Sequence, residues 1–182
     1  FTHVLAGPYI TSLFADMGAN IIKIERFEGE TIRRYGPVKK GQSGYFIQLN
    51  RGKRNLCLDL QHPKSRNIIK RLVEKADIVV ENFAPGTIGK LGYGYDVLSK
   101  WNPMVIMGSV SINGQYGPMS NALGFDILSQ SRGGMMSVTG DPDGPPTKAG
   151  TSIGDQISGL HAATAILAAV YEREQSGKGQ YL

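Results

Sequence analysis

Residues 55–81 read NLCLDLQHPKSRNIIKRLVEKADIVVE. Residues 55–59 alternate between polar and apolar side chains, which predicts a strand with Cys57 in the core. Residues 63–75 space their apolar side chains along one face of a helix, and residues 77–81 contain a short apolar run typical of a buried strand. A strand, a crossover helix and a second strand in this order predict a parallel βαβ unit.

The same alternation of strand-like and helical segments continues on both sides of this unit. Further strands are expected at residues 21–25 and 104–110, and further helices at residues 8–17, 95–101 and 125–132. The longest helix is expected to begin at Gly154 or Asp155, whereas residues 26–43 are predicted to form a long loop. The sequence therefore predicts an α/β fold, with a Rossmann-like open, mostly parallel sheet and helices on both faces.

Length and composition predict one folded unit. Residues 1–182 are 41% hydrophobic and 19% charged, enough to bury one sizeable core as a single domain. Both ends read as interrupted strands, so we expect the N-terminal part of a longer two-domain chain, truncated at both ends. The longest apolar helical stretch, residues 157–171, is shorter than the roughly 20 residues that span a bilayer, which argues against a membrane. One cysteine and no secretory signal make a cytoplasmic location the default expectation.

Charge is unevenly distributed along the chain. Residues 1–100 hold 16 Lys and Arg against 9 Asp and Glu, a balance of +7, whereas residues 101–182 hold 4 against 6, a balance of −2. A basic first half suits a polyanionic partner such as a phosphorylated cofactor, an anionic substrate or a nucleic acid. The alternative interpretation is that most of these cations lie on solvated helix faces.

Five segments, taken in order, carry a family resemblance. They are residues 4–8 (VLAGP), 18–26 (GANIIKIER), 50–54 (NRGKR), 81–86 (ENFAPG), and Gly154-Asp155 with the long helix that ends at residues 177–180 (GKGQ). In this order and spacing they resemble the class III CoA-transferase family. That family includes formyl-CoA, carnitine, bile-acid and 2-hydroxyacid CoA-transferases and the related α-methylacyl-CoA racemases, all considerably longer than this chain.

The resemblance implies two candidate catalytic residues, Asp155 and Asp126. By similarity, Asp155 attacks an acyl-CoA to give a mixed anhydride and then an aspartyl-CoA thioester, from which CoA passes to a carboxylic acid acceptor. A helix N-terminus favours an ionised, exposed carboxylate, although position alone favours a helix-capping role for this aspartate. Asp126 matches an acidic residue beside the family's active site. CoA and acyl-CoA are substrates here, and no permanently bound cofactor is expected.

Phe125 distinguishes the two branches of the family. The racemase branch has a histidine at this position, and phenylalanine cannot move a proton. A 2-methylacyl-CoA racemase is therefore the second alternative, behind the transferase. The family's glycine-rich loop near the nucleophile has no convincing equivalent in these residues.

The resemblance also implies residues that bind CoA. Arg26 and Lys90 would meet its phosphates, although Lys90 lacks the bidentate fork of the arginine found in some relatives. Apolar walls and backbone contacts would come from Leu5, Ala6, Leu58, Asn82, Phe83 and Ala84, for whose apolar members ordinary packing is the alternative. Family similarity further implies an interlocked homodimer. The acceptor acid cannot be read from these residues.

Two other classes of protein, serine hydrolases and nucleic-acid binders, and a metal site are weighed against this interpretation. Residues 150–154 match the G-x-S-x-G nucleophile elbow of serine hydrolases, but the stretch before them reads as a turn rather than a strand. Residues 50–54 are basic enough for a nucleic-acid binder but lack an aromatic ladder or a reading helix beside them. The three histidines lie far apart along the chain and apart from Cys57, so no metal site is expected.

Overall fold

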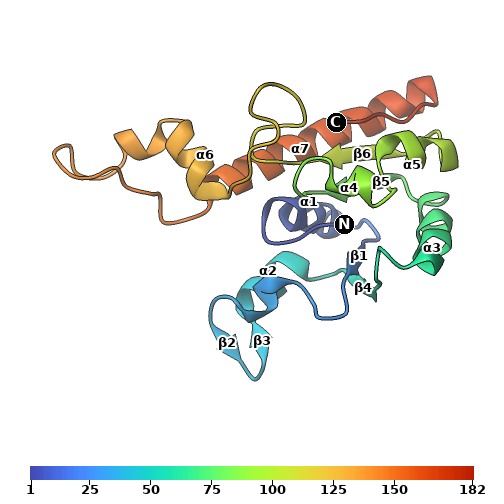
Figure 1. The fold of residues 1–182 in the computed structure, drawn as a ribbon, viewed down its shortest axis with the longest axis horizontal. Helices are drawn as coiled ribbons and strands as arrows, with labels where there is room; N and C mark the ends of the chain where they lie inside the picture. Colours follow the sequence, from blue (N-terminus) through green and yellow to red (C-terminus); the bar gives the residue numbers. More distant parts are fainter.

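The computed structural model describes residues 1–182, which form an α/β fold in which short strands alternate with helices (Figure 1). The helices are α1 (Ala6–Asp16), α2 (Gly44–Asn50), α3 (Pro63–Val73), α4 (Thr87–Lys90), α5 (Tyr95–Trp101), α6 (Asp126–Arg132) and α7 (Ile153–Ser176). The strands are β1 (Ile22–Glu25), β2 (Val38–Lys39), β3 (Gln42–Ser43), β4 (Arg54–Cys57), β5 (Ile78–Glu81) and β6 (Ile106–Ser109). Two 3-10 turns, η1 (Thr31–Arg34) and η2 (Met135–Val138), complete the chain. The α/β fold class is confirmed.

The parallel strands form two separate pairs. β1 pairs with β4, and β5 pairs with β6, both in parallel. Residues 1–3 lie between the pairs: the Phe1 amine donates to Val80 O at 2.9 Å, and Lys23 Nζ donates to Thr2 O at 3.0 Å. A cavity of about 540 Å³ lies between the facing strands β1 and β5. The parallel pairing is thus as predicted, but hydrogen bonds do not join the four strands into one ladder.

Helices cover both faces of the β5–β6 pair, as predicted. Because side chains alternate across a strand, neighbouring residues enter different cores. Val79 joins a cluster with α3 and α5, whereas Val80 joins a cluster with α1 and α7. On β6, Met107 joins the cluster with α3 and α5, and Ile106 joins the cluster with α1 and α7. Tyr181 forms an isolated parallel β-bridge with Met107. The last residues therefore extend this sheet, as the sequence suggested.

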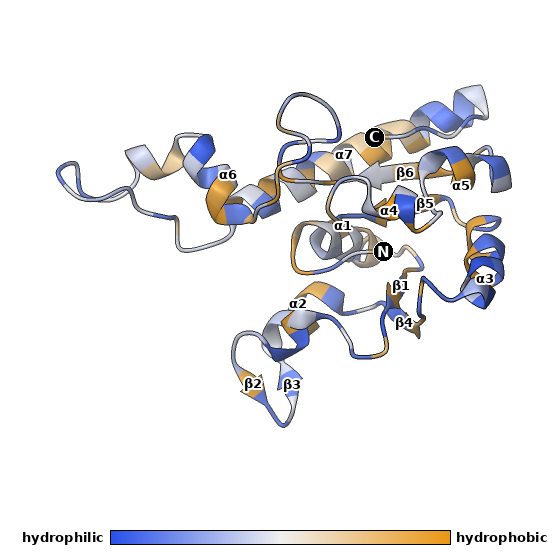
Figure 2. Cartoon of the chain, in the orientation of Figure 1, coloured by the Kyte–Doolittle hydropathy of each residue, from blue (hydrophilic) through white to orange (hydrophobic).

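The long helix α7 packs closely along α1. Gly159 is buried at the crossing, and a Cβ there would lie 2.9 Å from Tyr9 Cδ1 and 3.1 Å from Ala6 O. Near its other end, Arg173 Nη2 meets Asp77 Oδ1 at 3.0 Å. Helix α7 begins one residue before the predicted start and ends before Gly177 as predicted. Although its apolar stretch was expected to be too short for a bilayer, this 24-residue helix is the one helix long and apolar enough, by length and composition alone, to cross a membrane. Figure 2 shows apolar residues along much of it.

Two local predictions are wrong, and two helices, α2 and the single-turn α4, were missed. Cys57 is exposed, because β4 pairs on one side only and carries little cover. Residues 26–43 are not all loop: they contain η1 and a β2–β3 hairpin, whose turn places Lys40 and Gly41 at positive φ as tight hairpins require. The missed helix α2 begins after Ser43, whose Oγ accepts from Phe46 N at 3.1 Å.

Candidate functional site

Asp155 lies in the first turn of α7 rather than at its cap. The helix begins at Ile153 with Ser152 in the cap position, and the Ser152 side chain makes no capping hydrogen bond. Asp155 is therefore the third helical residue, and it is half-buried. The sequence-based alternative of a cap formed by Asp155 itself is wrong, because the cap position belongs to Ser152 and Asp155 is the acidic residue of the first turn.

The capping role belongs to Asp126 instead. Its Oδ1 accepts hydrogen bonds from Gly154 N at 2.8 Å and Asp155 N at 3.2 Å. Asp126 starts α6, is only 6% exposed, and reaches across to α7 from 29 residues away. A carboxylate in this place satisfies two unpaired donors and complements the helix dipole. The two predicted catalytic aspartates are thus brought together, with Asp126 holding the backbone that carries Asp155.

Close packing of α6 against α7 depends on Gly154. A Cβ at this position would lie 2.2 Å from Ser129 Oγ and 3.1 Å from Asp126 Oδ1. Any larger residue would therefore clash first with Ser129 and also crowd Asp126 at the start of α7. The glycine before Asp155 has a packing reason that the sequence pattern did not reveal.

Asp155 lies in an environment that disfavours its charge. Burial and, second, the nearby negative charge of Asp126 raise the pKa of Asp155 from 3.8 to about 6. Tyr45 on α2 faces the same pair: burial, followed by the charges of Asp155 and Asp126, raises the pKa of Tyr45 to about 12. Tyr45 was not among the predicted site residues, because no pattern links residue 45 to residue 155 along the chain.

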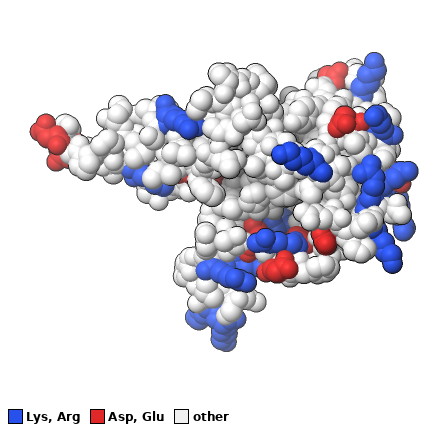
Figure 3. All heavy atoms as spheres, in the orientation of Figure 1, with Lys and Arg blue, Asp and Glu red and all other residues white.

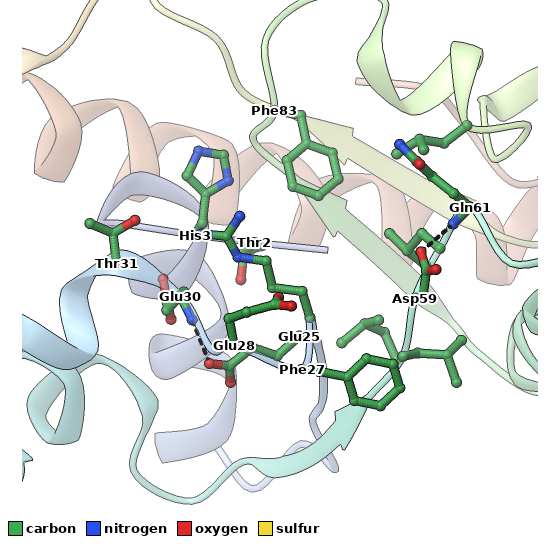
Figure 4. Close-up of a pocket in the computed structure, with 15 residues that line it drawn as sticks. Thr2, His3, Glu25, Phe27, Glu28, Glu30, Thr31, Asp59, Gln61 and Phe83 are labelled. Carbon is green, nitrogen blue, oxygen red and sulfur yellow. Dashed lines mark hydrogen bonds between the residues drawn. The ribbon is translucent and has the colours of Figure 1, made fainter.

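A second feature is a cavity of about 610 Å³ near the carboxyl ends of β1, β4 and β5 (Figure 4). Three predicted CoA-binding residues, Arg26, Leu58 and Phe83, line it. Its polar wall also contains Glu25, whose pKa burial alone would raise, but hydrogen bonds led by that from Arg33 lower the pKa to about 2. The carboxyl ends of parallel strands are where open α/β sheets bind ligands.

The turn after β5 connects this cavity to the start of α1. Asn82 Oδ1 accepts from His3 N and Asn82 Nδ2 donates to His3 O, both at 2.9 Å. The Phe83 ring stacks on the His3 imidazole with centroids 5.4 Å apart, which Figure 4 shows at the rim of the cavity. Glu81, 2% exposed, accepts from Phe83 N at 2.8 Å. The predicted residues Asn82 and Phe83 are therefore held in fixed positions.

The remaining predicted CoA-binding residues, Asn82 among them, do not line the cavity. Leu5 is buried in a small cluster with Ile32 and Leu49, and Ala6 is buried in the first turn of α1. Ala84 and Lys90 are exposed, outside the lining residues. Arg26 is thus the only Lys or Arg that lines this cavity.

The structure does not support the competing interpretations. No strand precedes Ser152, as a nucleophile elbow requires, and His161 lies further along α7, where its Nδ1 meets Ile157 O. No group of three potential ligands forms a metal site.

The basic segment 50–54, offered as a nucleic-acid surface, makes contacts within the chain. Arg51 pairs with Asp16, and Lys53 Nζ donates to Pro8 O at 2.8 Å and to Leu49 O at 2.6 Å. Burial lowers the pKa of Lys53 to about 7, so it is a weak cation. Figure 3 shows Lys and Arg gathered instead near the β2–β3 hairpin and on the side that carries α3.

The whole chain matches one protein family. A model described as "CoA-transferase family III" matches residues 1–182. The chain is 45% identical to a succinyl-CoA:mesaconate CoA-transferase of Haloarcula hispanica, covering 100% of this chain and 48% of that protein. It is 43% identical to an acetyl-CoA:oxalate CoA-transferase of Acetobacter aceti, with 100% and 47% covered.

Solved structures agree with the sequence comparison. The crystal structure of a CAIB/BAIF family protein from Brucella suis superimposes with a TM-score of 0.95 at 37% identity, covering 100% of this chain and 50% of that chain. The chain thus spans about half the length of the relatives it matches. With a family match from its first residue to its last, the chain belongs to CoA-transferase family III.

Proposed function

We propose that this chain carries the nucleophile of an enzyme that moves CoA from an acyl-CoA donor to a carboxylic acid acceptor. The two relatives named above are CoA-transferases, which favours this activity over the racemase alternative. Phe125 is 73% exposed at the start of α6 and offers no acid or base. The observation that carries the proposal is the geometry of Asp155, a half-buried carboxylate whose backbone is held by Asp126.

In the proposed first step, an Asp155 carboxylate oxygen attacks the thioester carbonyl carbon, the C–S bond breaks, and CoA leaves as a thiolate. The thiolate then attacks the Asp155 carbonyl of the mixed anhydride, releases the donor acid and forms an aspartyl-CoA thioester. The acceptor carboxylate reverses both steps and regenerates Asp155. With a pKa of about 6, Asp155 is mostly ionised at neutral pH, and its burial leaves the carboxylate poorly solvated. Both properties favour nucleophilic attack.

The cavity beside β1 and β4 is the proposed site of the nucleotide end of CoA. Arg26 supplies a cation for phosphate, and Leu58 and Phe83 supply an apolar wall for a planar base. The first turn of α1 lies between this cavity and α7: it follows His3 at the rim and packs through Ala6 O against Gly159. The thioester end would pass this turn to reach Asp155.

We further propose a homodimer for the intact protein. Apolar side chains on α6 and α7, including Ile127, Leu128, Ile157, Leu160 and Leu167, are exposed in the single chain. Such a surface suits burial against a second copy of the protein or against other residues of the intact protein. Sedimentation of the intact protein at micromolar concentration is expected to give a dimer mass, and a monomer mass would contradict this proposal.

Hydroxylamine trapping tests the activity. Hydroxylamine cleaves anhydrides and thioesters, so the intact protein incubated with an acyl-CoA and hydroxylamine is expected to acquire a hydroxamate on Asp155, detected by peptide mass spectrometry. The matched control is Asp143→Asn, which changes an exposed aspartate outside the site and should label normally. Asp155→Asn should neither label nor exchange CoA. An unmodified Asp155 peptide after turnover would refute the mechanism.

A further inference from the structure

Gln130 is a buried polar side chain that neither the family resemblance nor the proposed reaction uses. It lies one turn after Asp126 on α6 and is 2% exposed. Its Nε2 donates to Asp126 Oδ2 at 2.6 Å and to Thr151 O at 3.3 Å, and its Oε1 accepts from Ala149 N at 2.9 Å. The Gln130 side chain therefore links Asp126 to Ala149 and Thr151, in the segment that leads into α7.

These contacts divide the two oxygens of Asp126 between two tasks. Oδ1 accepts from the N–H groups of Gly154 and Asp155, so Oδ2 is left to Gln130 and Lys148. The last torsion of an aspartate side chain is only broadly restricted, so hydrogen bonds to both oxygens narrow the orientation of the carboxylate. The Gln130 hydrogen bond therefore fixes the plane in which Asp126 meets the start of α7.

Lys148 completes the arrangement from the other side. Its Nζ donates to Ala149 O at 2.8 Å and Thr151 O at 2.9 Å and lies 3.5 Å from Asp126 Oδ2. Two hydrogen bonds and one ion pair thus hold the Lys148 ammonium group to the loop and to Asp126. Gln130 and Lys148 thus hold the same two backbone segments, residues 149 and 151, against one carboxylate.

We propose that Gln130 is a positioning residue for the nucleophile: acting through Asp126, it sets the orientation of the first turn of α7 and the negative charge that Asp155 meets. The inference rests on the proposed function and deepens it. A shift of about 1 Å in a reacting group can cost about 10²-fold in rate, so losing this clamp should lower kcat strongly. The cavity lined by Arg26 and Phe83 shares no residue with the clamp, so KM for acyl-CoA should not change.

The charged and titratable groups around Asp155 fix the sign of the pH effect. They are Asp126 on α6, Lys148 in the preceding loop and Tyr45 on α2. Gln130→Met keeps the length of the side chain but removes the hydrogen bond that holds Asp126 Oδ2 in place. A less firmly placed negative charge should repel Asp155 less and move the acid limb of kcat to lower pH. Gln130→Glu adds a carboxylate beside Asp126 and should move the limb to higher pH, by up to about one pH unit.

The test measures kcat, KM and the pH profile of CoA transfer for the intact protein with three substitutions. Gln130→Met should lose about 100-fold in kcat with unchanged KM, and the two Gln130 variants should shift the acid limb in opposite directions. Gln42→Met, the same chemical change at an exposed position in the β2–β3 hairpin, should leave all parameters unchanged. A purely structural role for Gln130 would lower the melting temperature without moving the limb.

The outcomes separate the two proposals. If unsubstituted protein forms the Asp155 hydroxamate but both Gln130 variants keep its kcat and its acid limb, the positioning role is wrong and the reaction stands. If Gln130→Met does not fold, the pH profile of Gln130→Glu is the test, because this variant keeps the size of the side chain and one acceptor for Ala149 N. An unchanged acid limb of kcat in Gln130→Glu then overturns the inference. If no hydroxamate forms on Asp155 in unsubstituted protein, the proposed reaction is wrong and the role of Gln130 in it is wrong too.

Discussion

Replacing Asp155 with asparagine should abolish CoA transfer and, at the same time, stabilise the folded protein at neutral and alkaline pH. The reason is that burial and the charge of Asp126 raise the pKa of Asp155 from 3.8 to about 6, so the folded state holds an ionised carboxylate in an unfavourable place. Asparagine has the same shape without the charge. A nucleophile held in this way lowers stability in return for reactivity.

The magnitude follows from the pKa values. A rise of about two pH units corresponds to about 3 kcal/mol at 1.36 kcal/mol per unit, which is the largest gain expected from the substitution. Because the folded-state pKa lies above the unfolded value, the cost is absent below about pH 4, grows between pH 4 and 6, and is complete above that range. The gain from Asp155→Asn should therefore be at most about 3 kcal/mol at pH 8, and at pH 5 about half of its value at pH 8.

Urea unfolding of the intact protein at pH 8 and pH 5 measures this difference. The midpoint of Asp155→Asn should exceed that of the unsubstituted protein at both pH values, and by more at pH 8. Asp143→Asn removes an exposed carboxylate and should leave the midpoint unchanged. Equal stabilisation at the two pH values, or a loss of stability at pH 8, would show that Asp155 is not a desolvated carboxylate.

Two further predictions concern packing at the α1–α7 crossing and at the cavity. Gly159→Ala should destabilise the protein by about 1–3 kcal/mol in urea unfolding, because the new Cβ would press on Ala6 O and the Tyr9 ring. Ser158→Ala changes an exposed neighbour and should have no effect. Equal unfolding midpoints for the two variants would contradict this prediction. Phe83→Ala removes the stack on His3 and part of the cavity wall, so KM for acyl-CoA should rise about tenfold with little change in kcat. An unchanged KM would place the nucleotide elsewhere.

Most of the secondary structure could be read from local patterns. Helix α5 has the predicted bounds, β1 and β5 begin one residue later than predicted, and α6 lacks only its first predicted residue. These elements have clear apolar spacing, which follows from burying one face or one run. Helix α2 and the β2–β3 hairpin escaped because they are short and lie in a charged, glycine-rich stretch, where local capping and turn geometry decide the conformation.

Part of the candidate site was also predictable, because a family motif names single residues. Asp155 and Asp126 could be singled out this way, and the structure shows that one holds the backbone of the other. Of the predicted CoA-binding residues, the cavity of about 610 Å³ is lined by Arg26, Leu58 and Phe83 but not by Leu5, Ala6, Asn82, Ala84 or Lys90. A motif conveys identity along the chain, whereas lining a cavity depends on side-chain direction.

The sequence by itself determined the α/β class and the order of the elements, because these depend on periodicity and on residues close together in the chain, and the family resemblance it carries singled out the proposed nucleophile. Only the tertiary structure showed that Asp126 caps α7, that Gln130 and Lys148 fix its carboxylate, and that Tyr45 faces the same pair. Each of these contacts joins segments distant in sequence, and their energy depends on burial and on distances of a few ångströms. Such distances exist only once the chain has folded.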